Sequence, residues 1–190
     1  MLVRLKEKVE FLLKEVAKRL LRVGVTPNIL TAVGLCLSVV AAYFYAQPPA
    51  LWGIWLAAGL LFLSGFCDAL DGAMARIGNS ITPFGGFLDS LLDRYSEAAV
   101  ILGITLNSTF SPILGVAPLV WGLVAITGSI LVSYTRARAE SLDVQLAAVG
   151  LAERPERIMV LIVASVLLRP DLGVVAVAVL ANFTVVQRGL

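Results

Sequence analysis

The sequence has no histidine, only two cysteines and few charged side chains, and each shortage narrows what the protein can be. Without histidine, any general base has to be another side chain. Cys36 and Cys67 both fall in apolar stretches, so neither a disulfide framework nor a metal–thiolate site is expected. Charged residues make up 15% of the chain and hydrophobic residues 59%, a balance that excludes a soluble globular protein.

Long uncharged stretches indicate a membrane protein with several spans. Residues 23–67 and 98–135 carry no charged side chain, and each stretch exceeds the roughly 20 residues that one crossing needs. Polar or proline-rich breaks at residues 47–49 and 107–112 divide them. We therefore expect an all-α membrane protein with a single domain over residues 1–190. A bundle of six transmembrane helices is expected over residues 26–188. The helices are placed at about 26–46, 51–75, 84–106, 113–139, 152–168 and 172–188.

Residues 2–22 predict a different element, a cationic amphipathic helix that precedes the bundle. Leucine and valine recur there at helical spacing, with lysine and arginine mostly on the opposite face. Such a helix either lies in the lipid headgroup plane or packs on the cytoplasmic face of the protein, and the sequence leaves both open. Acidic residues interrupt it and no apolar core precedes a cleavage site, so it is not a signal peptide.

The distribution of basic residues predicts the orientation in the cell membrane. With six spans, almost all lysines and arginines fall at or near one side, and only Arg169 lies on the other. The positive-inside rule then places both termini and the region around residues 68–93 in the cytoplasm.

Four aspartates between residues 68 and 93 are the strongest functional signal. Carboxylates at membrane depth are costly unless they are paired or bind metal. Asp68 and Asp71 are three residues apart, and Asp89 and Asp93 are four apart, so each pair shares one face of a helix. Two such helices would bring the four carboxylates together, and hard oxygen ligands select Mg²⁺, Mn²⁺ or Ca²⁺. A cap or an arginine partner explains one buried aspartate more readily than all four.

Gly72 and Arg76 add a second chemical indication. A glycine within a helix costs about 1 kcal/mol relative to alanine, so Gly72 marks either close helix packing or the close approach of a ligand. Arg76 either anchors a span at the interface or holds a phosphate beside the carboxylates. Together with a metal, they indicate a nucleotide or diphosphate substrate. Asp93 is then the candidate general base.

The pattern Asp-x2-Asp-Gly-x2-Ala-Arg-x8-Gly-x3-Asp-x3-Asp, complete over residues 68–93, resembles the signature of the CDP-alcohol phosphotransferase family. The resemblance implies a six-helix homodimer that displaces CMP from a CDP-linked lipid with an alcohol. It implies two divalent metal ions, Mg²⁺ or Mn²⁺. By position, the implied metal ligands are Asp68, Asp71, Asp89 and Asp93, with Asp93 also the catalytic base. The implied contacts to the CDP-lipid are Asn28, Thr31, Asp68, Gly72, Arg76 and Thr82.

The second half of the chain bears on the choice of alcohol. Basic residues from three predicted spans either anchor the helices in the membrane or form a pocket for a phosphate dianion. The segments Tyr-Thr-Arg-Ala-Arg-Ala-Glu at 134–140 and Glu-Arg-Pro-Glu-Arg at 153–157 resemble the branch of the family that transfers to inositol 1-phosphate. The implied acceptor-phosphate contacts are Ser133, Arg136, Arg138, Arg154, Arg157 and Arg188.

Two other functions remain open on the sequence. Glycerol 3-phosphate is the main rival acceptor because it also carries a phosphate. A divalent-cation transporter would explain the carboxylates but would leave Gly72, Arg76 and the basic residues without a role. The donor is CDP-archaeol or CDP-diacylglycerol, and no nucleic-acid partner is expected.

Overall fold

Seven α-helices account for most of the residues that the computed structural model describes, which are 2–48, 51–144, 150 and 152–189, without the side chains of 2–10 and 12. The helices are α1 (Leu2–Arg22), α2 (Pro27–Ala46), α3 (Leu51–Ile77), α4 (Pro83–Thr105), α5 (Pro118–Glu140), α6 (Arg154–Val166) and α7 (Pro170–Gly189). A helix therefore forms at each of the seven places where the sequence predicts one.

Proline and threonine define where two of the helices that matter for the site begin. Pro27 and Pro83 occupy the first turns of α2 and α4, where a missing backbone N–H costs nothing. The preceding Thr26 and Thr82 cap these helices by accepting hydrogen bonds from the N–H groups of Ile29 and Gly85. The starts of α2 and α4 are thus fixed by local sequence.

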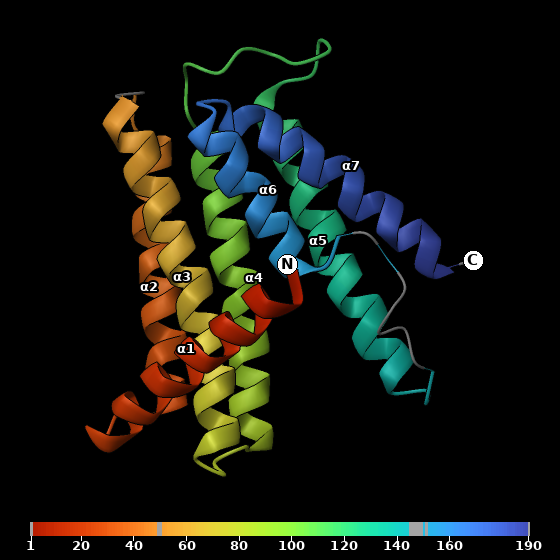
Figure 1. Cartoon of the computed structure of the whole chain (residues 1–190). Helices are drawn as coiled ribbons and strands as arrows, with labels where there is room; N and C mark the ends of the chain where they lie inside the picture. The colour runs from red at the N-terminus through yellow and green to blue at the C-terminus, as the bar shows by residue number, and fades with distance from the viewer. Residues whose placement is uncertain (1, 49–50, 145–149, 151, 190) are drawn as a thin grey trace.

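The helices form two groups that meet at α3, α4, α5 and α6. Helices α2, α3 and α4 stand beside one another, and α5, α6 and α7 lie on the other side (Figure 1). Contacts of α3 with α6 and of α4 with α5 join the groups, while α1 crosses the lower part of the first group against α3.

The prediction of six transmembrane helices is wrong. Within the described residues, only α2, α3, α5 and α7 are long and apolar enough to cross a membrane. Helix α4 has 23 residues, but Asp89, Asp93, Arg94 and Glu97 interrupt its apolar surface. Helix α6 has only 13 residues, which span about 20 Å of a hydrocarbon core about 30 Å thick. The uncharged stretches are divided where the sequence predicts, but the prediction assigned α4 and α6 too much apolar length.

Helix α1 packs on the protein itself. Leu13, Val16 and Leu20 surround a small cluster in which Ala17 of α1 and Met74 of α3 are fully buried. On the opposite side Lys14, Lys18, Arg19 and Arg22 are exposed. Of the two placements that the sequence left open, the structure shows the apolar face of α1 covering α3, with its basic face turned outward.

The turn between α6 and α7 is closed by an ion pair. Arg169 donates from Nε and Nη2 to the two carboxylate oxygens of the buried Asp171, both at 3.0 Å. These hydrogen bonds raise the pKa of the Arg169 guanidinium. The pair lies at the opposite end of α6 from Arg154.

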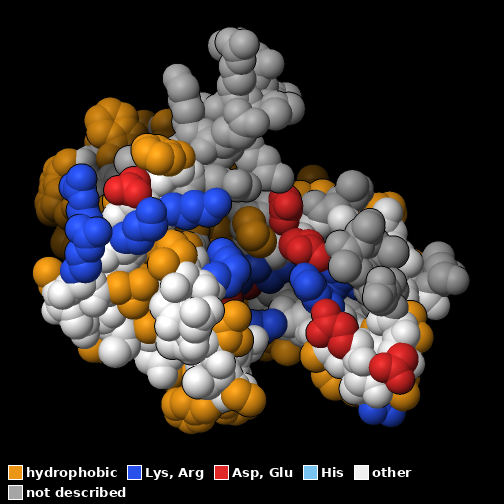
Figure 2. Space-filling model, turned by 60° about the horizontal axis from the view of Figure 1, so that its bottom comes forward, with side chains coloured by type: hydrophobic (Ala, Val, Ile, Leu, Met, Phe, Trp, Pro, Cys, Tyr) orange, Lys and Arg blue, Asp and Glu red, His pale blue; other side chains and the backbone are white. Residues whose placement is uncertain are grey.

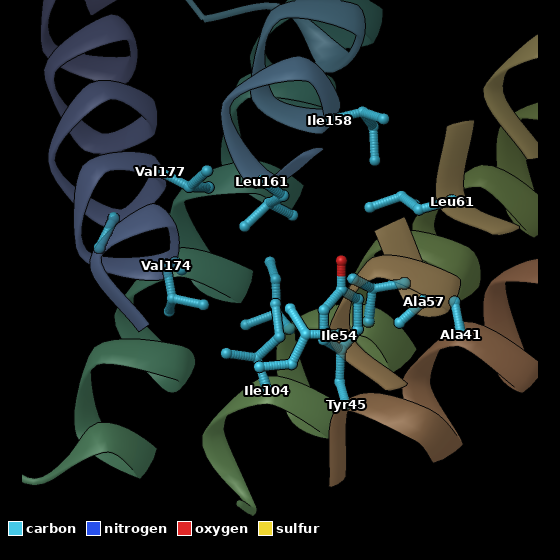
Figure 3. Packing of buried hydrophobic residues seen from close by; sticks show 14 residues of the cluster. Ala41, Tyr45, Ile54, Ala57, Leu61, Ile104, Ile158, Leu161, Val174 and Val177 are labelled. Atoms are coloured by element: carbon cyan, nitrogen blue, oxygen red, sulfur yellow. The ribbon is translucent and has the colours of Figure 1, made fainter. Parts of the chain in front are cut away.

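The main core lies between the two helix groups. It contains Ile54 and Leu61 of α3, Ile104 of α4, Leu161 of α6 and Val177 of α7 (Figure 3). Tyr45 is buried among them, and its hydroxyl is 2.7 Å from that of Ser165. Dispersion and burial of apolar surface hold the groups together here, away from the charged residues.

Gly103 shows how closely α2 and α4 approach. A Cβ atom at this position would stand 2.7 Å from the Cα of Ala42, and closer still to its carbonyl oxygen. We expect Gly103→Ala to force the two backbones apart and to destabilise the protein by about 1–3 kcal/mol. Thermal unfolding of the detergent-solubilised protein measures the effect.

Gly59→Ala is the matched control, because the added Cβ would meet nothing within 4 Å. It should be neutral or stabilising by up to about 1 kcal/mol through helix propensity. Equal thermal stability of the two variants would contradict the close α2–α4 contact.

Candidate functional site

The aspartates predicted to bind metal lie close together at the ends of α3 and α4. One carboxylate oxygen from each of Asp68, Asp71 and Asp89 lies within 4.8 Å of the others. Asp93 joins them through Arg154 of α6, whose Nη1 is 2.9 Å from Asp68 Oδ2 and whose Nη2 is 2.8 Å from Asp93 Oδ1. Helical spacing thus predicted the convergence of Asp68, Asp71 and Asp89, whereas the fourth aspartate, Asp93, is connected to them by Arg154.

Helix α2 orients one member of this cluster. Thr31 donates its hydroxyl hydrogen bond to Asp71 Oδ2 at 2.7 Å, and Asp71 is buried. Thr31 is itself held one turn into α2, with its Oγ1 3.1 Å from the carbonyl oxygen of Pro27. A hydrogen bond of this kind fixes the direction in which a carboxylate presents its second oxygen.

The donor atoms of the cluster fit a divalent metal ion. They are carboxylate oxygens, the ligands that hard divalent cations prefer. Asp89 Oδ1 is buried and has no hydrogen-bond partner among the described residues. An unpartnered buried carboxylate oxygen is costly, and coordination to a cation would satisfy it.

A cavity of about 220 Å³ opens on one side of the cluster. The start of α2, the end of α3 and the start of α4 form its walls. Of the residues predicted to contact the CDP-lipid, it is lined by Asn28, Thr31, Gly72, Arg76 and Thr82. Asp68, the sixth, does not line it and faces the other side.

A larger cavity of about 540 Å³ opens on that other side. Asp68 and Asp93 lie in its wall with residues of α5, α6 and α7. Of the residues predicted to bind the acceptor phosphate, it is lined by Ser133, Arg136, Arg154, Arg157 and Arg188. Arg138 is not among the lining residues; it is exposed and contacts Ser141. Figure 2 shows basic side chains gathered around the hollow on this face, with acidic ones beside them.

The arginines of the larger cavity differ in what already holds them. Arg136 Nε is 3.0 Å from Glu140, and its Nη1 is 3.4 Å from Glu153. Arg188 donates from Nη1 to the carbonyl oxygen of Val132 at 2.6 Å and from Nη2 to Glu153 at 3.2 Å. Glu153 therefore lies between two arginines that come from different helices.

Arg157 is held most firmly. It is only 1% exposed, and it donates from Nε and Nη2 to the two carboxylate oxygens of Glu97 at 2.6 and 2.7 Å. Its Nη1 donates to the carbonyl oxygen of Ala152 at 2.7 Å. All three guanidinium nitrogens of Arg157 therefore donate hydrogen bonds to protein atoms, although the residue forms part of the cavity wall.

Two carboxylates of this region, Glu97 and Glu153, were not among the predicted site residues. Glu97 lies four residues after Asp93 and eight after Asp89, which places all three on one face of α4. That spacing was available as a signal. Glu153 belongs to the segment 153–157 that resembles one branch of the family, but its pairing with Arg136 and Arg188 had no local signal because both arginines are distant in the sequence.

The family model and the sequence relatives of this chain agree with each other. Residues 24–186 match the model of the CDP-alcohol phosphatidyltransferase family. The chain is 40% identical to the archaetidylinositol phosphate synthase of Pyrococcus horikoshii, over 99% of this chain and 94% of that protein. It is 39% identical to the phosphatidylinositol phosphate synthase of Cutibacterium acnes, over 78% of this chain and 70% of that protein.

Solved structures agree with the sequence relatives. The phosphatidylinositol phosphate synthase of Mycobacterium tuberculosis, 30% identical, superposes with a TM-score of 0.77 in its structure with CDP-DAG bound, covering 93% of this chain and 90% of that one. In its complex with manganese and citrate the TM-score is 0.78, covering 93% and 86%.

Proposed function

This chain belongs to the CDP-alcohol phosphatidyltransferase family, and from that premise we propose that it transfers the phosphatidyl or archaetidyl group of a CDP-linked lipid to inositol 1-phosphate, with release of CMP. The synthases named among its relatives support this acceptor. As a membrane transferase of phospholipid synthesis, it has to bring a lipid donor and a soluble phosphorylated alcohol to one reacting centre.

The observation that carries the proposal is the position of the aspartate cluster between two cavities. Asp71, Gly72 and Asp89 line both the smaller and the larger cavity. A donor in one and an acceptor in the other would meet at these residues. Two substrates held on opposite sides of the reacting phosphorus suit an in-line displacement.

The smaller cavity is assigned to the CDP group of the donor. The guanidinium of Arg76 can donate two hydrogen bonds to a phosphate, and Asn28 and Thr82 supply polar groups for the nucleotide. Gly72 has no side chain, which lets a flat or charged group lie against the α3 backbone.

The larger cavity is assigned to the acceptor. Ser133, Arg136, Arg154 and Arg188 supply a hydroxyl and three guanidinium groups from α5, α6 and α7, a set that matches a phosphate dianion. Arg138 lies outside this cavity and Arg157 is engaged by Glu97, so neither is assigned to the phosphate.

The carboxylates Asp68, Asp71, Asp89 and Asp93 would hold the metal ions, which we infer to be two, either Mg²⁺ or Mn²⁺. The manganese complex of the mycobacterial relative supports a divalent metal. When bound, the ions supply Lewis-acid neutralisation of the charge that develops on the diphosphate.

Asp93 is the proposed general base. It lines the acceptor cavity, and the described part of the cavity wall offers no histidine because the chain has none. Asp93 takes the proton of the attacking hydroxyl of inositol 1-phosphate. The oxygen then bonds to the β-phosphorus of the CDP-lipid, the bond from that phosphorus to the bridging oxygen breaks, and CMP leaves with that oxygen.

The orientation and assembly complete the proposal. Arg76, Arg94, Arg136 and Arg188 line the two cavities at the aspartate end of the molecule, whereas Arg169 lies at the other end of α6. The positive-inside rule therefore favours an active site and termini that face the cytoplasm. We also propose that the whole chain acts as one membrane domain and forms a homodimer, which crosslinking in native membranes would test.

The acceptor can be identified directly by release of CMP from the CDP-lipid in detergent or proteoliposomes with one alcohol at a time. We expect release with inositol 1-phosphate and little with glycerol 3-phosphate or serine, since serine lacks a phosphate for the arginine set. Both CDP-archaeol and CDP-diacylglycerol should be supplied as donors.

Release with glycerol 3-phosphate but not with inositol 1-phosphate would refute the proposed acceptor. Divalent-metal flux through proteoliposomes that lack CDP-lipid, without release of CMP in the transfer assay, would instead favour a cation transporter.

Asp93→Asn tests the proposed base. The amide keeps the size of the side chain but cannot accept the proton, so turnover should fall by at least about 100-fold. Binding of CDP, measured by calorimetry, should be largely preserved because Asp93 does not line the smaller cavity. Near-normal turnover would exclude Asp93 as the base.

Gly72→Ala tests the donor side. The added Cβ would contact only the end of the Arg76 side chain, at 3.4 Å, so the fold should tolerate it. Because this methyl group would project towards the CDP site, we expect CDP affinity to drop about 10-fold or more. Gly65→Ala is the control on the same helix, where nothing lies within 4 Å. Equal CDP affinity of the two variants would contradict the assigned site.

A further inference from the structure

The buried pair of Glu97 and Arg157 makes no contribution to the reaction as described above, although Arg157 forms part of the wall of the acceptor cavity and Glu97 lies behind it. We propose that Glu97 and Arg157 are positioning residues that set the geometry of the acceptor cavity and hence its affinity for the phosphorylated alcohol. This inference rests on the proposed function and deepens it.

Two ion pairs lie one helical turn apart between α4 and α6. Asp93 and Glu97 are four residues apart on α4, while Arg154 and Arg157 are three apart on α6. The outer pair, Asp93 with Arg154, lines the cavity. The inner pair is almost fully buried, with Glu97 3% and Arg157 1% exposed, and its bidentate geometry leaves little freedom.

Glu97 also holds the helix that carries other acceptor residues. Ser129 of α5 donates to Glu97 Oε1 at 2.9 Å. Ser133 lies one turn further along α5, with its hydroxyl 3.3 Å from the carbonyl oxygen of Ser129, and Arg136 lies almost two turns beyond Ser129. One carboxylate therefore joins α4, α5 and α6, and all three supply side chains to the cavity.

Arg157 in turn fixes the beginning of α6. Glu153 occupies the N-cap position of this helix, but its side chain accepts no hydrogen bond from the first turn. Its carboxylate lies between Arg136 and Arg188 instead. The hydrogen bond from Arg157 Nη1 to the carbonyl oxygen of the buried Ala152 replaces the missing restraint. Glu153 and Arg154, the next two residues, thereby enter the cavity in a fixed direction.

A purely structural pair would affect only the amount of folded protein, whereas a positioning pair also changes how the acceptor binds. The test measures KM for inositol 1-phosphate at saturating CDP-lipid, and KM for CDP-lipid at saturating acceptor. The double variant E97M/R157M replaces both charges by apolar side chains of similar length, a change that buried ion pairs often tolerate in folding. The second variant, R157K, keeps the charge but loses the fork that reaches Glu97 and Ala152 together.

We expect KM for inositol 1-phosphate to rise about 10- to 100-fold in E97M/R157M, because small displacements of binding groups have effects of this size. KM for CDP-lipid should stay within about twofold of the wild type, since the pair does not line the smaller cavity. The KM of R157K for inositol 1-phosphate should lie between that of the wild type and that of E97M/R157M. Tyr45→Phe, which removes a remote buried hydrogen bond to Ser165, should lower thermal stability and leave both KM values unchanged.

An unchanged KM for the acceptor in either variant, or an equal rise in both KM values, would overturn the positioning role. If E97M/R157M does not fold, R157K alone decides. Failure of the proposed function has a different signature, because the wild type would then release no CMP with inositol 1-phosphate. If it releases CMP with glycerol 3-phosphate instead, the same KM comparison with that alcohol decides the role of the pair.

Discussion

A charge inside an apolar helical bundle has to be compensated by another charge or by a bound ion, and this requirement organises the structure. Helix α4 carries Asp89, Asp93 and Glu97 on one face. Arginines of α6 form ion pairs with Asp93 and Glu97. Asp89 instead lies with Asp68 and Asp71 of α3. Apolar packing alone would not specify how α3, α4 and α6 are rotated about their axes. The pairing of charges specifies it, and the carboxylates in excess of the arginines create the place for a cation.

The pairing of charges divides the bundle along its helices into an apolar part and a polar part. Away from the aspartate end, alanine, valine, leucine and isoleucine pack without charge, and close approach such as that at Gly103 determines the helix spacing. Glu97 and Arg157 form the boundary, fully buried and fully hydrogen-bonded. Beyond them the helices separate around the two cavities, where the polar groups are partly solvated. A rigid buried layer below a more open polar one suits an enzyme that must hold reactive groups still while substrates enter.

The aspartate cluster was predictable from the sequence because helical spacing within one element is a local property. Asn28, Gly72, Arg76 and Thr82 were grouped only through the resemblance to the family signature, because they come from different helices; the structure places all four in the wall of one cavity. Arg138 and Arg157 show the limit of such reasoning. Both were grouped with their neighbours Arg136 and Arg154, but Arg138 is exposed outside the larger cavity, whereas Arg157 lines that cavity with its guanidinium already bound to Glu97. How an arginine is oriented and what holds it depend on partners distant in the sequence.

The six-span prediction failed because it counted α4 as a span although this helix carries Asp89, Asp93, Arg94 and Glu97. These charges have a place in the fold, since Asp93 and Glu97 pair with arginines of α6 and Asp89 lies with the aspartates of α3. The shortness of α6 adds to this, because a helix of 13 residues does not run on past the cavity. Its first turn ends in the cavity wall, where Glu153, Arg154 and Pro155 lie. The partial positive charge of a helix N-terminus favours an anion at that place. The features that make α4 and α6 poor membrane spans therefore also build the larger cavity, because the charged face of α4 supplies Asp89 and Asp93 to its wall and the first turn of α6 supplies Arg154.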